Sequence, residues 1–247
     1  MSNSPALIAL SAALVLTVGC ARSANENRAA DTTAAAGAMD ESTREVAAGG
    51  IAAAGWSGRI DPKEAASGQK LENAKLAQKG DTLMVTTGPA VVYWNPANTA
   101  TGNYTVRATF HEPQYMNVND HPHPYGLFIG GNDMGTDQQS YLYCSAYGSG
   151  KFIVRGFGPE PFQMNARGEE NAAVNKAAGK NQPVTQQIAI SVKPDKVECA
   201  INGTTVASYD KSALVTSGKL KSTDGVYGIR FAHNTDGVVT GLTKTTP

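Results

Sequence analysis

The 247-residue sequence has no excess of either charge, because 21 lysine and arginine residues balance 21 aspartate and glutamate residues. It contains no basic cluster, so it lacks the electrostatic footprint that binding to nucleic acid requires. Nucleic acid is therefore not an expected partner. Histidine and cysteine are also scarce, with four and three residues respectively.

Paired carboxylates are missing from the segments that alternate like strands. Sandwich-type glucanases need two carboxyl groups roughly 5 Å apart, which alternate positions of one strand provide. The segments 104–111, 140–147 and 151–157 contain no aspartate or glutamate, and Glu198 stands alone in its own segment. A glucanase-like reaction is therefore disfavoured.

One apolar run, residues 6–18, lies near the start of the chain and is followed by Gly19 and Cys20. Its 13 residues have the length of a signal-peptide core and are too few to span a bilayer. The order of residues 16–20 resembles a bacterial lipobox, in which the cysteine is lipidated. Residues 1–20 are therefore predicted to be a lipoprotein-type signal peptide with lipidation at Cys20. An ordinary secretory signal is the alternative, because residues 1–5 carry no lysine or arginine.

Composition changes after this segment. Residues 21–55 are rich in alanine, glycine, serine and threonine and have almost no large apolar side chains, so they are predicted to form a disordered tether. Residues 56–247 are long enough for a single β-sandwich domain. The predicted location is the cell envelope, periplasmic or surface-facing, with the membrane as a partner through the lipid anchor.

Strand patterns and tight-turn signals follow one another through this domain. Within 104–111, apolar side chains alternate with Thr, Arg and His, which places one face on a core and the other in water. The glycines of 148–150 and the Asn202-Gly203 pair are typical of hairpin turns. These patterns predict an all-β fold of two antiparallel sheets.

Four sequence segments resemble those of a known family: TTGPAVVYW at 86–94, HPYGLFIGG at 123–131, ING at 201–203 and GIRFAH at 228–233. Through them the domain resembles the concanavalin A-like lectin and glucanase superfamily, and within it an exported bacterial branch akin to the 3-keto-disaccharide hydrolase domain family. The resemblance implies a jelly-roll sandwich whose sheet face or rim loops meet a saccharide. It implies no particular reaction.

Two cysteines, Cys144 and Cys199, remain once Cys20 is assigned to the lipid anchor. Period-2 alternation points both side chains into the core, so facing strands would bring them together in an oxidising compartment. A disulfide is one reading, and two buried free thiols are the other.

A row of tyrosines shares the opposite face of the 140–147 segment. If its even-numbered residues fill the core, the tyrosines at 141, 143 and 147 face outward as flat rings on which a sugar could stack. Two arginines and a histidine on the non-core faces of their own strands would supply hydrogen bonds. Ordinary cross-strand packing of the tyrosines is the alternative. The predicted ligand-binding residues of these strands are Tyr141, Tyr143, Tyr147, Arg107, His111 and Arg230.

Loop residues supply the remaining candidates. His121 and His123 lie in a proline-held extended loop and are predicted to contact a metal or a sugar hydroxyl, although two histidines do not complete a zinc site. His233, at the end of the last strand of the domain, is predicted to reach a rim site. A calcium ion is possible at an oxygen-rich turn formed by Asn132, Asp133 and Asp137. In each case a solvated or hydrogen-bonding loop residue is the alternative.

The sequence therefore predicts an exported, noncatalytic carbohydrate-binding protein of the envelope, with no cofactor beyond a possible calcium ion. A glycosidic-bond hydrolase or lyase is the first alternative, and it would require His111, His121, Tyr143 and Arg230 to converge in one pocket. A structural or protein-interaction module is the second alternative.

Overall fold

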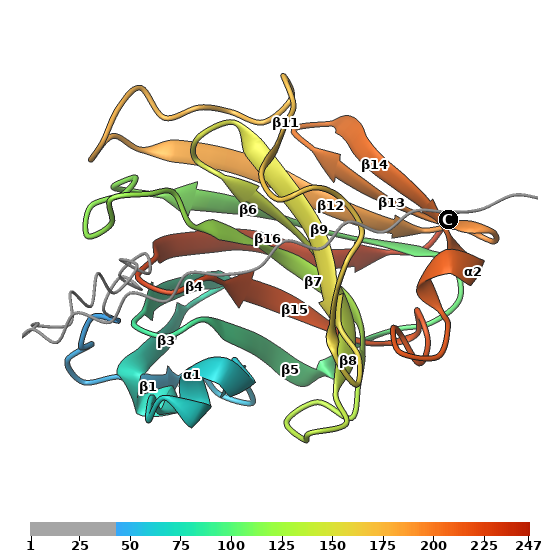
Figure 1. Ribbon diagram of the computed structural model, residues 1–247, viewed down its shortest axis with the longest axis horizontal. Helices are drawn as coiled ribbons and strands as arrows, with labels where there is room; N and C mark the ends of the chain where they lie inside the picture. The colour runs from blue at the N-terminus through green and yellow to red at the C-terminus, as the bar shows by residue number, and fades with distance from the viewer. Residues whose placement is uncertain (1–42) are drawn as a thin grey trace, which may run out of the picture. The chain divides into compact units, whose positions relative to one another are not determined.

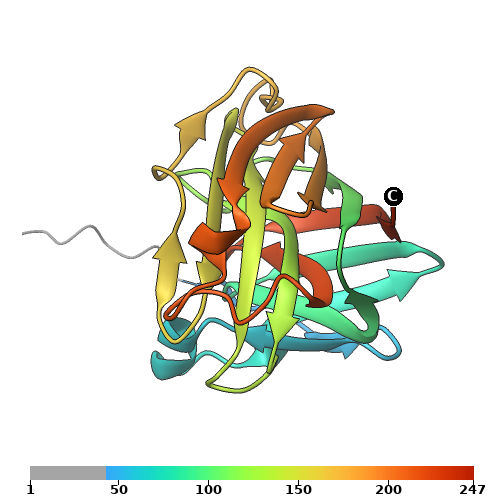
Figure 2. The same ribbon diagram turned by 90° about the vertical axis from the view of Figure 1, so that its right-hand side faces the viewer.

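A computed structural model describes residues 43–247, and the predicted signal peptide, Cys20 and the first part of the predicted tether lie outside this range. Two sheets are packed face to face in the described part of the chain (Figure 1, Figure 2). The predicted all-β, two-sheet sandwich is confirmed.

The first sheet has eight strands, and every pair is antiparallel except β1 with β3. Its strands are, in spatial order, β1 (Gly50–Ala52), β3 (Ala74–Lys79), β4 (Thr82–Thr87), β16 (Asp236–Thr245), β6 (Tyr104–Glu112), β12 (Val184–Val192), β13 (Lys196–Ile201) and β14 (Thr204–Asp210).

The second sheet is antiparallel throughout and forms the other layer. Its strands are, in spatial order, β10 (Pro161–Gln163), β9 (Lys151–Phe157), β8 (Ser140–Tyr147), β7 (Pro124–Asn132), β15 (Gly225–Phe231), β5 (Val91–Ala100) and β2 (Ser57–Ile60), while β11 (Glu169–Glu170) also pairs with β9.

Helices are short: α1 (Pro62–Ala66), η1 (Leu71–Asn73) and α2 (Lys211–Leu214). None of these has the length or apolar character needed to cross a bilayer. The predicted Asn202-Gly203 turn joins β13 to β14, and both residues have the positive φ, 49° and 84°, that a two-residue hairpin loop requires.

The boundary predicted between tether and domain is wrong for residues 43–55. Strand β1 lies within the predicted tether, yet it pairs with β3 and extends the first sheet. Arg44 also donates to the Asp236 carboxylate, at 2.6 and 3.1 Å, and to the carbonyl oxygen of Thr87 at 2.7 Å. A small-residue composition indicated disorder here, but pairing with the edge strand β3 and an ion pair with the half-buried Asp236 order the segment. Neither partner is adjacent in the sequence.

The core lies between the two sheets and is built by alternation. On β6 the predicted core face is buried, and Phe110 lies against two aromatic rings of the other sheet. Its ring centroid is 5.8 Å from that of Tyr125 on β7 and 6.0 Å from that of Phe231 on β15. Burial of such side chains contributes about 1.5–3 kcal/mol each, so this aromatic contact holds the layers together.

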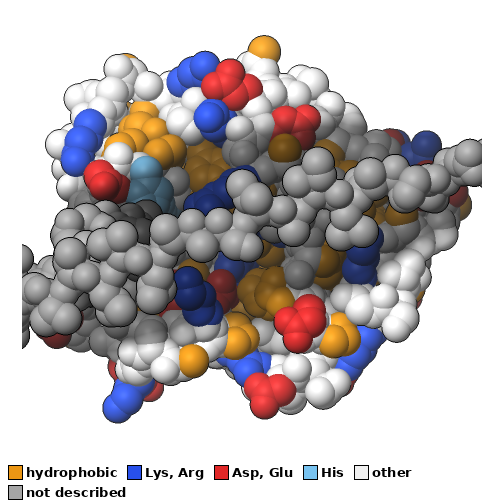
Figure 3. Space-filling view, in the orientation of Figure 1, with side chains coloured by type: hydrophobic (Ala, Val, Ile, Leu, Met, Phe, Trp, Pro, Cys, Tyr) orange, Lys and Arg blue, Asp and Glu red, His pale blue; other side chains and the backbone are white. Residues whose placement is uncertain are grey.

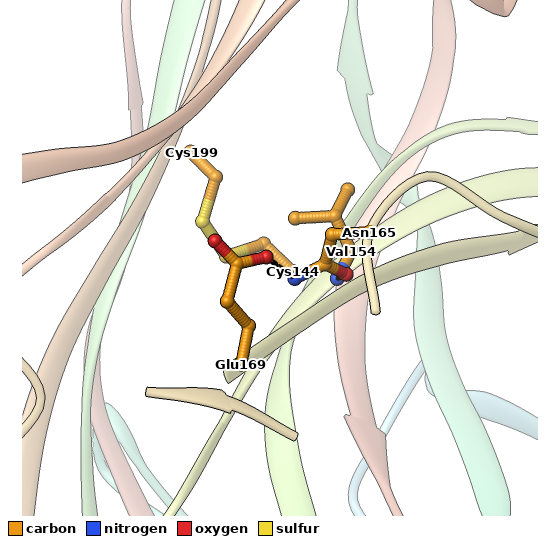
Figure 4. The surroundings of a disulfide bond; sticks show 5 residues. All are labelled: Cys144, Val154, Asn165, Glu169 and Cys199. Carbon is orange, nitrogen blue, oxygen red and sulfur yellow. Dashed lines mark hydrogen bonds between the residues drawn. A yellow bond between two sulfur atoms is a disulfide. The ribbon is translucent and has the colours of Figure 1, made fainter. Parts of the chain in front are cut away.

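A disulfide between Cys144 on β8 and Cys199 on β13 joins the two sheets through this core (Figure 4). In the chain-entropy model, a bridge across 55 residues stabilises the fold by about 4 kcal/mol. Beside it, Asn165 accepts a hydrogen bond from the backbone nitrogen of Val154 at 2.7 Å and donates to Glu169 at 3.0 Å. The long polar insertion is therefore tied to β9 in this region.

Candidate functional site

A cavity of about 680 Å³ lies on the face of the second sheet that points away from the core. Strands β8, β9 and β15 form its floor, while β10 and the segment from β2 into α1 form its walls. On the face drawn in Figure 3, hydrophobic, basic and acidic side chains lie close together. The residues that give the cavity its chemistry are Arg59, Asp61, Tyr143, Arg155, Phe157, Phe162 and Arg230.

Cross-strand register explains why these side chains meet. On the β8–β9 hairpin, Tyr143 lies directly opposite Arg155, and Tyr141 lies opposite Phe157. Directly opposite residues share one face of a sheet, so the hairpin presents two aromatic rings and a guanidinium group on the same side. On the opposite, core-facing side of β9, Gly156 lies between Arg155 and Phe157, and the ring of Phe162 occupies the space where its Cβ would lie.

Arg230 is the anchor of the site. Its guanidinium donates two hydrogen bonds to the Asp61 carboxylate, at 2.7 and 2.6 Å, in a bidentate arrangement. It also donates to the Tyr141 hydroxyl at 3.3 Å and lies 4.8 Å from the Tyr143 ring centroid and 5.3 Å from that of Phe157. A cation over two aromatic rings and against one carboxylate is a rigid, oriented arrangement.

Burial sets the protonation states around this anchor. Burial lowers the pKa of Arg230, but the charge and hydrogen bonds of Asp61, together with Tyr141 and Tyr143, outweigh burial and hold that pKa well above its ordinary value. Burial raises the pKa of Tyr141 far above its ordinary value, despite the opposing effect of Arg230. Arg230 therefore stays charged and Tyr141 stays a neutral phenol at any physiological pH.

The arginines of the cavity differ in their partners. Arg59 donates to the Asp137 carboxylate at 2.5 Å and to the carbonyl oxygen of Thr136, so its charge is neutralised. Arg155 has a buried Nε atom with no hydrogen-bond partner among the described residues. A buried donor without a partner costs about 1–3 kcal/mol, and a ligand oxygen would remove that cost.

The predicted tyrosine platform is wrong as an open stacking surface. Alternation placed Tyr141, Tyr143 and Tyr147 on the correct side, opposite the core-facing Leu142, but all three are buried, with exposed fractions of 0%, 7% and 9%. They form a second, smaller cluster with Phe128 and neighbouring apolar residues. Of the three tyrosines only Tyr143 lines the cavity.

The other strand-borne candidates lie on the first sheet, not at this cavity. Arg107 pairs in register with Ala189 on β12, is exposed, and lines a separate cavity of about 620 Å³. The Nδ1 atom of His111 is 2.9 Å from the Thr185 hydroxyl, in the same sheet. The four-residue cluster that a hydrolase would require is therefore not formed, because His111 lies on a different sheet from Tyr143 and Arg230.

Three of the four histidines meet at one end of the second sheet. His121 and His123 precede β7, and His233 follows β15, the neighbour of β7 in the sheet. Their ligand atoms lie within 4.8 Å of one another, and no other group of three or more histidine, cysteine or acidic residues with this spacing occurs in the described part of the chain. The sequence indicated a two-histidine pair, and the structure adds the third imidazole.

The predicted calcium residues are engaged with protein groups instead. Asp133 forms an ion pair with Lys221, and Asp137 forms one with Arg59. The Asn132 amide nitrogen donates to the carbonyl oxygens of Gly130 and Asp224 at 3.0 and 2.9 Å. This turn offers no convergent set of free oxygen ligands, so the structure does not favour calcium there.

Sequence reasoning missed Asp61, Arg155 and Phe157. Alternation along β9 places Arg155 and Phe157 on one face, and the hairpin with β8 then puts that face beside the tyrosines; this signal was present in the sequence and was not used. No comparable signal exists for Asp61, because its partner Arg230 is 169 positions away.

Solved structures resemble this chain in fold. A carbohydrate-binding module, CBM66, from Bacillus subtilis has a TM-score of 0.51 at 9% sequence identity, and the match covers 80% of this chain and 99% of the module. A protein of unknown function with a galectin-like fold, also from Bacillus subtilis, has a TM-score of 0.53 at 14% identity, covering 77% and 89%. No protein-family model matches the sequence, and no curated protein sequence matches it either. At these identities the likeness shows a galectin-like, concanavalin A-like β-sandwich and nothing more.

Proposed function

We propose that the chain is an exported, noncatalytic carbohydrate-binding protein and that the cavity on the second sheet holds the sugar. One observation carries the proposal: Arg155, whose Nε has no hydrogen-bond partner among the described residues, lines a cavity that also includes the aromatic residues Tyr143 and Phe157. The cavity volume of about 680 Å³ falls within the range of about 300–1,000 Å³ found for small-molecule sites.

The cavity lining offers both apolar and hydrogen-bonding groups to a saccharide. The half-buried ring of Phe157 offers flat apolar surface for the C–H face of a sugar. Arg155 would donate to a hydroxyl or carboxylate oxygen at the sugar rim, and Gln139 and Gln163 add amide groups along the same lining.

The carboxylates of the cavity favour binding over hydrolysis. Glycosidic hydrolysis uses one protonated carboxyl group as an acid and a second carboxylate as base or nucleophile. Asp61 is held bidentately by Arg230, and Asp137 is paired with Arg59. Both carboxylates are engaged by guanidinium groups, which leaves Glu160 as the remaining carboxylate of the lining, so the cavity does not present the pair of carboxyl groups that a hydrolase uses.

The fold and the family-like sequence segments add weaker support for carbohydrate binding. One of the two similar structures is a carbohydrate-binding module by name, which is a property of that protein. The segments at 123–131 and 228–233 that resemble the keto-disaccharide hydrolase branch lie on neighbouring strands, β7 and β15. We infer, as part of the same proposal, that the chain belongs to that exported branch. Release of sugar by the protein would instead identify it as a hydrolase.

Export and lipid anchoring belong to the proposal. The 13-residue apolar run ending one residue before Gly19-Cys20 supports a lipoprotein signal. The disulfide between Cys144 and Cys199 supports an oxidising compartment, because such bridges are rare in the cytosol. The anchor predicts a membrane-bound protein whose attachment depends on Cys20.

A glycan array read for both retained and released sugar tests the proposal. We expect retention without product, followed by a loss of affinity of about 10- to 100-fold in Arg155→Ala, because a hydrogen bond to a charged group contributes about 1.5–3 kcal/mol. Arg107→Ala is the matched control, since it removes an arginine from the other sheet. Product release would identify an enzyme, and equal losses in both variants would refute the assigned cavity.

A further inference from the structure

The three histidines at the end of the second sheet are brought together by strand pairing. Strands β7 and β15 pair in register with Tyr125 opposite Phe231. Beyond these residues, the backbone nitrogen of Ala232 donates to the carbonyl oxygen of Pro124 at 3.0 Å, so the two strands stay paired up to the point where the histidines project. The pairing fixes His123 beside His233, although they are 110 positions apart.

The spacing of the imidazole nitrogens matches that of metal ligands. The Nε2 atom of His123 is 2.9 Å from Nε2 of His121 and 3.2 Å from Nε2 of His233. In a tetrahedral zinc site with Zn–N bonds of about 2.0–2.1 Å, neighbouring ligand nitrogens lie about 3.3 Å apart. All three ligand atoms lie within 4.8 Å of one another, so the cluster approaches the spacing of a coordination shell and side-chain adjustment would complete it.

The other nitrogen of two of these rings is already held. Nδ1 of His121 is 2.5 Å from the Asp120 carboxylate, and Nδ1 of His123 is 2.6 Å from the carbonyl oxygen of His233. Both partners accept hydrogen bonds, so each Nδ1 carries the proton and each Nε2 presents a lone pair to the shared centre. A carboxylate or carbonyl behind the ring is the outer-shell arrangement that orients histidines on metals.

We propose that His121, His123 and His233 form a Zn²⁺ site and supply three of its four tetrahedral positions. Three imidazole nitrogens favour zinc over calcium or magnesium, which prefer oxygen ligands. The site is independent of the sugar cavity, and its test requires no saccharide.

The full chain, stripped with EDTA and dialysed, is titrated with zinc chloride by calorimetry and with Co²⁺ by visible absorption. We expect one Zn²⁺ per chain and Co²⁺ bands typical of tetrahedral coordination. Affinity should fall as the solution is acidified, because protonated imidazole cannot coordinate. His233→Ala should weaken binding by at least 100-fold, and Asp120→Asn by about 10-fold.

The chain supplies its own matched control, because its fourth histidine, His111, lies on the first sheet. His111→Ala should bind zinc as the unchanged protein does. His123 is buried, so a variant at that position risks misfolding, but the side chain of His121 is 50% exposed and His121→Ala tests the same site. Loss of zinc in His111→Ala, retained zinc in His121→Ala, or no stoichiometric zinc in the folded protein would each overturn the proposal.

Discussion

The carboxyl group of Glu112, at the end of β6, should make the fold less stable as the pH rises. The side chain is only 5% exposed, and its Oε2 atom has no hydrogen-bond partner among the described residues. Burial raises its pKa from the ordinary value of 4.5 to about 7, and the negative charge of Asp236 adds to the rise, while the backbone at Met116 opposes it.

The direction follows from proton linkage. Between pH 4.5 and about 7 the folded chain keeps a proton on Glu112 that the unfolded chain has lost. Stability contributed by the protonated group is therefore fully present below pH 4.5 and lost as the pH rises to about 7. At about 1.36 kcal/mol per pKa unit, a rise from 4.5 to about 7 corresponds to about 3 kcal/mol.

Urea denaturation from pH 4 to pH 9 measures this effect in Glu112→Gln against the unchanged chain. The variant carries no charge, so we expect it to lose the decline between pH 4.5 and 7 and to be up to about 3 kcal/mol more stable at pH 8. Glu72→Gln, which removes an exposed carboxylate, should retain the decline. Identical pH profiles for Glu112→Gln and the unchanged chain would refute the reasoning.

Two further predictions concern the cavity anchor and the membrane anchor. Asp61→Ala should destabilise the fold by about 3–5 kcal/mol, because it leaves the Arg230 charge buried and unpaired, and adding Arg230→Met should cost less than the sum of the single changes in chemical denaturation. Additive losses would show that the pair does not act as a unit. In the host cell, Cys20→Ser should move the protein from the membrane fraction to the soluble fraction, and a variant that stays with the membrane would contradict the lipid anchor.

Local alternation was enough to predict the fold of the described domain. On β6 and β8 it assigned the core face correctly, and the Asn202-Gly203 pair marked a real hairpin. It failed at β1, where a segment of small residues is ordered by pairing with β3. Whether a segment pairs with the edge of a sheet depends on an unpaired strand nearby in space, and the composition of the segment gives no information about that strand.

The candidate site was less predictable, because alternation tells which way a side chain points but not what covers it. Tyr141 points away from the core as predicted, yet Phe157 stacks on it at 5.2 Å and Arg230 caps its hydroxyl. The side chains that bury Tyr141 come from other segments of the chain, and the Arg230–Asp61 pair shows that these segments can be far apart in sequence. The third histidine of the cluster was hidden for the same reason, since His233 joins His121 and His123 only through the pairing of β15 with β7.

Strand geometry keeps the two proposed sites apart. The histidines lie at the end of the second sheet where Pro124 pairs with Tyr147. The cavity begins at Tyr143, which precedes Tyr147 by four residues on β8. At about 3.3 Å per residue this is a separation of roughly 13 Å, beyond hydrogen-bond reach. A zinc ion there would tie together the ends of β7 and β15, and so hold the strand that carries Arg230. It would not activate water at a sugar held against Arg155, so a structural role for this metal agrees with the proposed noncatalytic binding.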